Sequence, residues 1–157
     1  MNKYDVIIIG AGPSGIFCAY ELMRQKSDMK VLMIEKGRSI EKRQCPKRTT
    51  KVCVGCKPCS ITTGFAGAGA FSDGKLSLSP DVGGTLPEIL GYEKAEELIK
   101  EADNIYLKFG ADEKVYGIDD YEAIERIRAK AIRANLKLIE CPIRHLGTEE
   151  GYKIYTR

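Results

Sequence analysis

Residues 5–35 have the sequence DVIIIGAGPSGIFCAYELMRQKSDMKVLMIE, and this stretch decides how the start of the chain folds. Two short apolar runs, Val6–Ile9 and Val31–Ile34, flank a glycine turn and a segment with helical apolar spacing from Pro13 to about Gln25. The turn has the spacing G-x-G-x-x-G, and the acidic residue Glu35 closes the second run. A strand, a glycine turn, a helix, a second strand and an acid in this order indicate a dinucleotide-binding βαβ unit.

Each motif residue has a physical task in such a unit. Gly10 permits the tight turn, Gly12 removes the Cβ that would block a pyrophosphate, and Gly15 lets the helix pack closely on the strand. The free backbone N–H groups at the start of the helix face the phosphates, and the helix dipole favours their negative charge. Glu35 would accept hydrogen bonds from a ribose diol and repel a 2′-phosphate, which favours FAD or NAD over NADP. The alternative is a βαβ unit whose glycines serve only the turn, but a turn alone does not require three glycines and the acid at this spacing.

Composition sets the broad class. The chain has 157 residues, of which 43% are hydrophobic, enough for a domain with a core. Residues 1–60 carry 12 Lys/Arg and 5 Asp/Glu, and residues 61–157 carry 13 and 17, so positive charge gathers around the proposed phosphate site. The net charge of +3 is too small to argue for nucleic acid. No secretory signal or membrane-length apolar segment is visible, which predicts a cytoplasmic protein without a membrane partner.

A basic loop with four cysteines follows Glu35. Cys45, Cys53, Cys56 and Cys59 have the spacing C-x7-C-x2-C-x2-C. Three interpretations stay open: an iron–sulfur cluster, for which the close C-x2-C pairs resemble part of a ferredoxin run; a zinc site, whose pairs are normally farther apart; and metal-free thiols made reactive by nearby cations. Among the basic residues of this loop, we expect Arg43 to reach the adenine or the pyrophosphate.

A second glycine-rich segment, GFAGAGAFSDGK, covers residues 64–75. It cannot build a core of its own, and small residues in series let a backbone lie against a large planar ligand with its N–H groups donating to that ligand. A flexible glycine loop is the alternative.

Together, residues 4–15, Glu35-Lys36-Gly37, the cysteine loop and residues 64–75 resemble the N-terminal third of FAD-dependent dehydrogenases of bacteria and archaea, also termed NAD(P)/FAD-dependent oxidoreductases. The resemblance implies a flavoprotein of the glutathione-reductase-like superfamily, in which the first motif binds the ADP of FAD and the second segment lies near the pyrophosphate and isoalloxazine. Ala66 departs from this pattern, because glycine is expected there, and no C-terminal Gly-Asp element for the ribityl chain occurs before Arg157. The candidate cofactor-binding residues are Gly10, Gly12, Pro13, Ser14, Gly15, Glu35, Lys36, Arg43, Gly67, Gly69, Ser72, Asp73 and Gly74.

The predicted fold class is α/β, an incomplete Rossmann-like parallel sheet of the glutathione-reductase-like kind. We expect residues 1–80 to form the FAD-binding core and residues 81–157 a helical and α/β continuation that begins an inserted or substrate lobe. The later elements are a helix over residues 92–109, a second helix opened by an Asp119/Glu122 capping box, a strand over residues 136–141 and another over residues 152–156. The only histidine, His145, and Cys141 are expected to be structural.

The predicted function is that of an FAD-dependent oxidoreductase acting on a small-molecule substrate, with NAD(P)H as a candidate electron donor. We expect this chain to be its N-terminal FAD-binding portion, inactive when isolated, and the pattern identifies no catalytic residue and no oligomeric state. One alternative is a flavin-free NAD-binding dehydrogenase domain, which has no use for a second glycine-rich segment. The other is a non-catalytic metal-binding or redox-sensing module built on the four cysteines.

Overall fold

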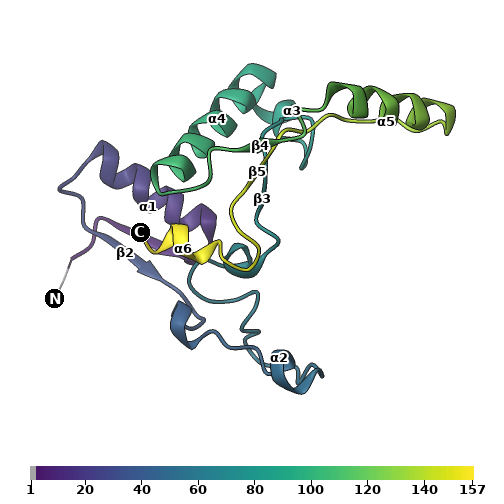
Figure 1. Ribbon diagram of the computed structural model, residues 1–157. Coiled ribbons are helices and arrows are strands. Elements are labelled where there is room, and N and C mark those ends of the chain that lie inside the picture. The colour runs from purple at the N-terminus through teal and green to yellow at the C-terminus, as the bar shows by residue number, and fades with distance from the viewer. Residues whose placement is uncertain (1–2) are drawn as a thin grey trace. The chain divides into compact units, whose positions relative to one another are not determined.

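The computed structural model describes residues 3–157, which divide into two units (Figure 1). The first unit comprises the chain up to Asp73 together with Thr148–Arg157, and the second comprises Gly74–Gly147. The chain thus returns to the first unit after the second is complete, and the expected domains, residues 1–80 and residues 81–157, stay a prediction.

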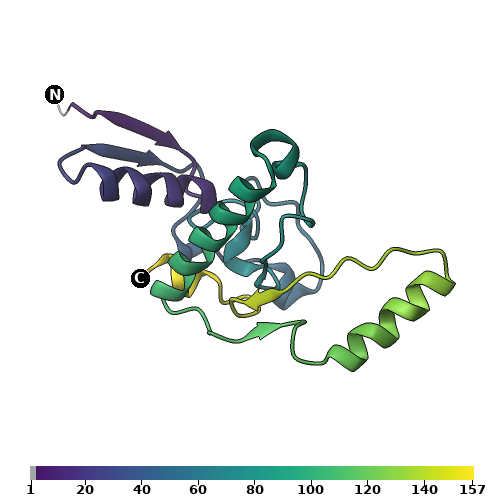
Figure 2. The same ribbon diagram turned by 90° about the horizontal axis from the view of Figure 1, so that it is seen from above.

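The first unit contains the predicted βαβ segment. Strands β1 (Val6–Ile9) and β2 (Val31–Ile34) are parallel, with Val6 opposite Val31 and Ile9 opposite Ile34. Parallel neighbours need a crossover connection, and helix α1 (Pro13–Gln25) supplies it, lying along the two strands as Figure 2 shows. The sequence prediction of these three elements is confirmed, but the parallel sheet of the described residues has two strands.

The two faces of this small sheet differ. The side chain of Ile8 faces α1, since a Cβ at Gly15 would lie 3.3 Å from its Cγ2. The neighbours Ile7 and Ile9 alternate to the opposite face and are 57% and 88% exposed. Parallel sheets usually bury both faces, so this face is an apolar surface that the described chain leaves open.

Short helical segments complete the first unit. They are η1 (Ile40–Lys42), α2 (Lys47–Thr50), η2 (Ala68–Phe71) and α6 (Tyr152–Tyr155). The prediction of a strand over residues 152–156 is wrong. This segment turns back on η2, where the Tyr152 ring lies 5.8 Å from that of Phe71 and Ile154 is buried, so its apolar side chains are covered without strand pairing.

The second unit is organised around an antiparallel sheet that the sequence did not predict. Its strand order is β3 (Lys75–Ser77), β5 (Ile143–His145) and β4 (Val115–Tyr116). Helices α3 (Leu86–Leu90), α4 (Tyr92–Lys108) and α5 (Tyr121–Arg133) complete it, and α4 and α5 confirm the helices expected there. The strand predicted over residues 136–141 is wrong, because pairing begins only after Pro142.

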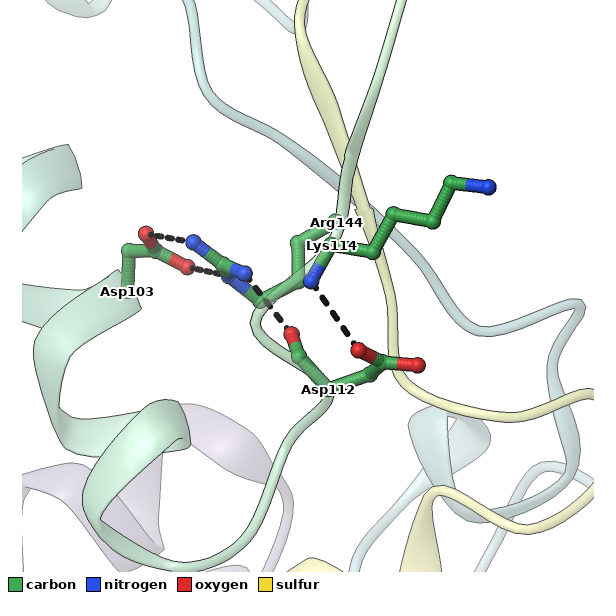
Figure 3. A network of polar contacts seen from close by, with 4 residues as sticks. All are labelled: Asp103, Asp112, Lys114 and Arg144. Carbon is green, nitrogen blue, oxygen red and sulfur yellow. Dashed lines mark hydrogen bonds and ion pairs between the residues drawn. The ribbon is translucent and has the colours of Figure 1, made fainter.

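A buried arginine connects the central strand of this sheet to α4 and to the loop before β4. Arg144 on β5 is 4% exposed, and its guanidinium pairs with both carboxylate oxygens of Asp103 on α4 (Figure 3). Its Nη1 also donates to the carbonyl of Asp112 at 2.7 Å, and the Asp112 side chain accepts from the Lys114 amide. One side chain thus joins a strand, a helix and the loop before β4.

No helix of the described residues is long and apolar enough to cross a membrane.

Candidate functional site

The glycine turn between β1 and α1 has the geometry that the motif predicts. Gly10 has a φ of +103°, a backbone conformation that favours glycine. A Cβ at Gly15 would lie 2.0 Å from the Gly10 carbonyl oxygen, so helix and strand approach too closely for any other residue. The backbone N–H groups of Ser14 and Gly15 belong to the first turn of α1, where no intrahelical acceptor exists.

Glu35 joins the end of β2 to this turn. Its Oε2 accepts from the Ala11 amide at 2.8 Å, and its Oε1 accepts from the Gly37 amide at 2.8 Å. These hydrogen bonds favour the charged form, so the pKa of Glu35 lies below its ordinary value. Each carboxylate oxygen can accept more than one hydrogen bond, so this arrangement fixes the carboxylate and leaves it able to accept from a ligand hydroxyl.

The second glycine-rich segment lies directly against the first. The Ala66 amide donates to the Ala11 carbonyl at 2.8 Å, and a Cβ at Gly67 would lie 3.0 Å from Gly12 Cα. Ala66 is fully buried with a φ of +66°, so alanine occupies a conformation that favours glycine at the position where glycine was expected. Two segments far apart in sequence therefore form one continuous glycine-rich surface.

A cavity of about 490 Å³ opens over this surface. Of the predicted cofactor-binding residues, five line it: Gly10, Gly12, Glu35, Lys36 and Gly67. Five others were not predicted: Ile9, Ile34, Thr62, Thr63 and Gly64. The two isoleucines come from the ends of the strands. The two threonines immediately precede the second glycine-rich segment, and this adjacency is the sequence signal that could have added them to the predicted site.

Several predicted residues lie away from the cavity lining. Pro13, Ser14 and Gly15 form the start of α1, and Gly69 packs near Pro13 and Tyr155. Ser72 accepts from the Glu149 amide through its carbonyl, Asp73 accepts from the Thr148 hydroxyl in the same way, and Gly74 accepts from the Leu146 amide. The last three therefore lie where the chain leaves and re-enters the first unit, and their contact with a cofactor stays a prediction.

The structure places Arg43 inside the protein, and its predicted contact with a cofactor stays a prediction. It is 5% exposed, and its guanidinium donates to three backbone carbonyls: Ser60 at 2.9 Å, Ile61 at 2.6 Å and Phe65 at 2.5 Å. Its charge also lies over the Phe71 ring, 4.8 Å from the centroid. Arg43 thus holds together the segments that carry the cavity wall, with its donors directed to the protein backbone.

The four loop cysteines are free thiols. Cys53, Cys56 and Cys59 are exposed and Cys45 is half-buried. Within residues 3–157, no group of three or more His, Cys, Asp or Glu side chains is placed to hold a metal ion, so the iron–sulfur and zinc interpretations find no support in the structure. Hydrogen bonds from Thr62 and Ile61, together with the charge of Arg43, lower the pKa of Cys59, which is consistent with the reactive-thiol interpretation.

Comparisons with known proteins concern the first motif. A model of the Thi4 family matches residues 1–41. The chain is 48% identical over 33 residues to the thiamine thiazole synthase of Coprinopsis cinerea, which covers 21% of this chain and 10% of that protein. It is 58% identical over 36 residues to an uncharacterized protein of Methanosarcina barkeri, covering 23% of this chain and 9% of that protein.

No solved structure matches the chain. The matched segments span about a tenth of the length of these curated relatives, and the family model covers residues 1–41, which contain the βαβ unit.

Proposed function

We propose that this chain is the FAD-binding portion of a flavin-dependent oxidoreductase. The observation that carries the proposal is the cavity of about 490 Å³ on two touching glycine-rich segments, beside a fixed carboxylate at the end of β2. Its volume is within the roughly 300–1,000 Å³ of small-molecule sites. The Thi4 likeness over residues 1–41 supports this assignment for the nucleotide-binding segment.

The residues present fit an ADP moiety. Gly10 and Gly12 leave open space where a side chain would project, because a Cβ on Gly10 meets no atom within 4 Å and one on Gly12 meets only Gly67 Cα at 3.9 Å. The N–H groups at the start of α1 would donate to the pyrophosphate, and Glu35 would accept from the ribose hydroxyls. Lys36 adds positive charge at the rim of the cavity. When bound, the flavin supplies the electron-transfer chemistry, and these residues bind and orient it.

FAD is favoured over NAD because the second glycine-rich segment contributes to the cavity. Gly64 and Gly67 both line it, and an NAD-binding domain has no need of such a segment. The substrate of the proposed oxidoreductase is a small molecule, with NAD(P)H as the proposed electron donor. The thiazole synthase chemistry named for the Coprinopsis relative belongs to that protein and is not proposed for this chain.

Two alanine variants test the proposal. In Gly12→Ala the new Cβ enters the cavity with only an ordinary van der Waals contact to Gly67, and φ at this residue is −78°, so we expect normal stability and FAD affinity weakened about tenfold or more. In the matched variant Gly15→Ala the Cβ collides with the Gly10 carbonyl, so we expect loss of both stability and FAD affinity. Titration of the chain into FAD, followed by flavin fluorescence and absorbance, measures the affinity, and urea unfolding measures the stability.

The wild-type chain should bind FAD and bind NAD much more weakly. Tight binding of NAD without FAD would move the assignment to a flavin-free NAD domain. An unchanged FAD affinity in Gly12→Ala would show that the cofactor does not use this cavity.

A further inference from the structure

A second cavity lies in the first unit, on the side of the cysteine loop. Its volume is about 330 Å³, and it is bounded by Arg38 after β2, by Cys56 and Lys57 of the cysteine loop, and by Ser60 and Thr63. Thr63 also lines the larger cavity, so the two cavities adjoin at this residue. Nothing in the proposed FAD-binding role uses Arg38, Cys56 or Lys57.

The charged residues that line this cavity are all positive. Arg38 and Lys57 are both exposed, and within residues 3–157 neither side chain forms an ion pair. By contrast, Arg24 pairs with Glu21 and Arg48 pairs with Glu149. The residues that line the cavity in this part of the chain include no Asp or Glu. Two cationic residues therefore line one cavity whose lining includes no carboxylate among the described residues.

The uncharged lining residues suit an anion as well. Ser60 and Thr63 carry hydroxyl groups, and Gln44 carries a side-chain amide, so three neutral groups that can donate hydrogen bonds accompany the two cations. Hydrogen bonds between charged and polar partners are stronger than those between neutral ones, and guanidinium geometry matches carboxylate and phosphate oxygens.

The backbone that carries these groups is held by contacts within the unit. The Arg38 carbonyl accepts from the Phe65 amide at 3.1 Å, and the Thr63 amide donates to the Cys59 carbonyl at 2.9 Å. The Ser60 carbonyl accepts from Arg43, whose own guanidinium is buried. These bonds join protein groups to one another and hold the backbone that lines the cavity, and a lining held in place lowers the free-energy cost of binding.

We propose that this cavity is a binding site for a small oxygen anion, a phosphate or carboxylate group, held by Arg38 and Lys57 with the Cys56 thiol at its wall. The proposal stands apart from the FAD assignment, because it concerns a different cavity and its test contains no flavin.

The position of Cys56 provides a direct probe. Iodoacetate and iodoacetamide alkylate a thiolate in the same way, forming an S–C bond as iodide leaves, but only iodoacetate is an anion. The ratio of their rates at one cysteine therefore cancels the fraction of thiolate and reports attraction of an anion to that position. Mass spectrometry of the full chain gives this ratio separately for Cys56 and for Cys53, an exposed cysteine outside the cavity lining.

We expect the iodoacetate-to-iodoacetamide ratio at Cys56 to exceed that at Cys53 about fivefold, as one close charge interaction in water would give. Arg38→Gln should lower the Cys56 ratio although Arg38 is far away in the sequence. The matched variant Lys42→Gln removes the same charge from an exposed position outside the lining and should leave the ratio unchanged. Inorganic phosphate or acetate, compared with chloride at equal ionic strength, should slow labelling of Cys56, and whichever protects better identifies the preferred group.

Three results would overturn the proposal. Equal ratios at Cys56 and Cys53 would mean that the cavity attracts no anion. Equal effects of Arg38→Gln and Lys42→Gln would mean a general basic surface rather than a site. Labelling of Cys56 that neither phosphate nor acetate slows would mean that no such anion binds there.

Discussion

Glu35 forms hydrogen bonds within the protein in addition to its proposed contact with a ribose. Its two carboxylate oxygens accept from the amides of Ala11 in the glycine turn and of Gly37 after β2. The carboxylate therefore fixes the glycine turn relative to the end of β2. Glu35 therefore has two roles: the glycine motif predicts that it accepts hydrogen bonds from a ribose, and the structure shows that it connects two backbone segments. The two roles need separate tests.

The variant Glu35→Gln tests the structural role. An amide offers one oxygen acceptor, and its NH2 group would face one of the two backbone N–H donors, so one hydrogen bond is lost. We expect the free energy of unfolding to fall by about 1 kcal/mol, since the site is partly open to solvent. Urea unfolding at pH 7 measures this loss, and Asp28→Asn, which removes an exposed carboxylate of the first unit, is a control for the general effect of removing a carboxylate.

The same carboxylate predicts a pH dependence. Hydrogen bonds from Ala11 and Gly37 hold the pKa of folded Glu35 below its ordinary value of 4.5. A group with a depressed folded pKa stabilises the fold fully above its unfolded pKa, and this contribution is lost as the pH falls through the folded pKa. Wild-type stability should therefore fall below about pH 4.5, and Glu35→Gln should lack that part of the decrease. Parallel acid profiles would contradict this account.

Among the elements, α5 shows how closely sequence patterns place a helix start. The expected capping box used Asp119, but the N-cap is Asp120, whose Oδ1 accepts from the Ala123 amide at 2.9 Å. Asp120→Ala should lower the free energy of unfolding by about 1 kcal/mol, because an amide of the first turn loses its acceptor. Asp119→Ala should change it by less than half as much. Urea unfolding followed by circular dichroism compares the two, and a larger effect of Asp119→Ala would reassign the cap.

The elements that sequence predicted are those with a long or distinctive pattern. β1, α1 and β2 follow from the glycine motif, and the 17-residue α4 and 13-residue α5 follow from helical periodicity. Strands β3 and β4 have three and two residues, too few for any alternation to be visible. The segments 136–141 and 152–156 contain apolar residues typical of strands, but no strand within residues 3–157 pairs with them, and pairing depends on residues far away in the sequence.

For the site as well, the residues that were predicted are those that belong to a distinctive sequence pattern. Gly10, Gly12 and Glu35 were predicted because the motif fixes their spacing, and the structure brings them to one cavity together with Gly67. The position of Arg43 was not predictable, because its partners are carbonyl groups, which every residue carries and no pattern distinguishes.

At the scale of the molecule, each unit has its own buried arginine. Arg144 pairs with Asp103 inside the second unit, and breaking a buried pair costs about 3 kcal/mol because the remaining guanidinium loses the carboxylate that pairs with its charge. Asp103→Asn should therefore raise amide hydrogen exchange across residues 74–147 and leave residues 3–73 unchanged. Glu97→Gln removes an exposed partner of Lys94 in the same unit and should have little effect. Equal increases in both units would mean that they unfold as one.

The arginine of the first unit has another consequence. Arg43 donates to the carbonyls of Ser60, Ile61 and Phe65, so its guanidinium joins the two ends of the basic segment between residues 43 and 60. A protease that cut this exposed segment at Lys47 or Lys51 would leave two pieces that remain joined through the guanidinium and through the Arg38–Gly64 bridge. We therefore expect the threonines that follow this segment to keep their place beside the glycines after such a cut.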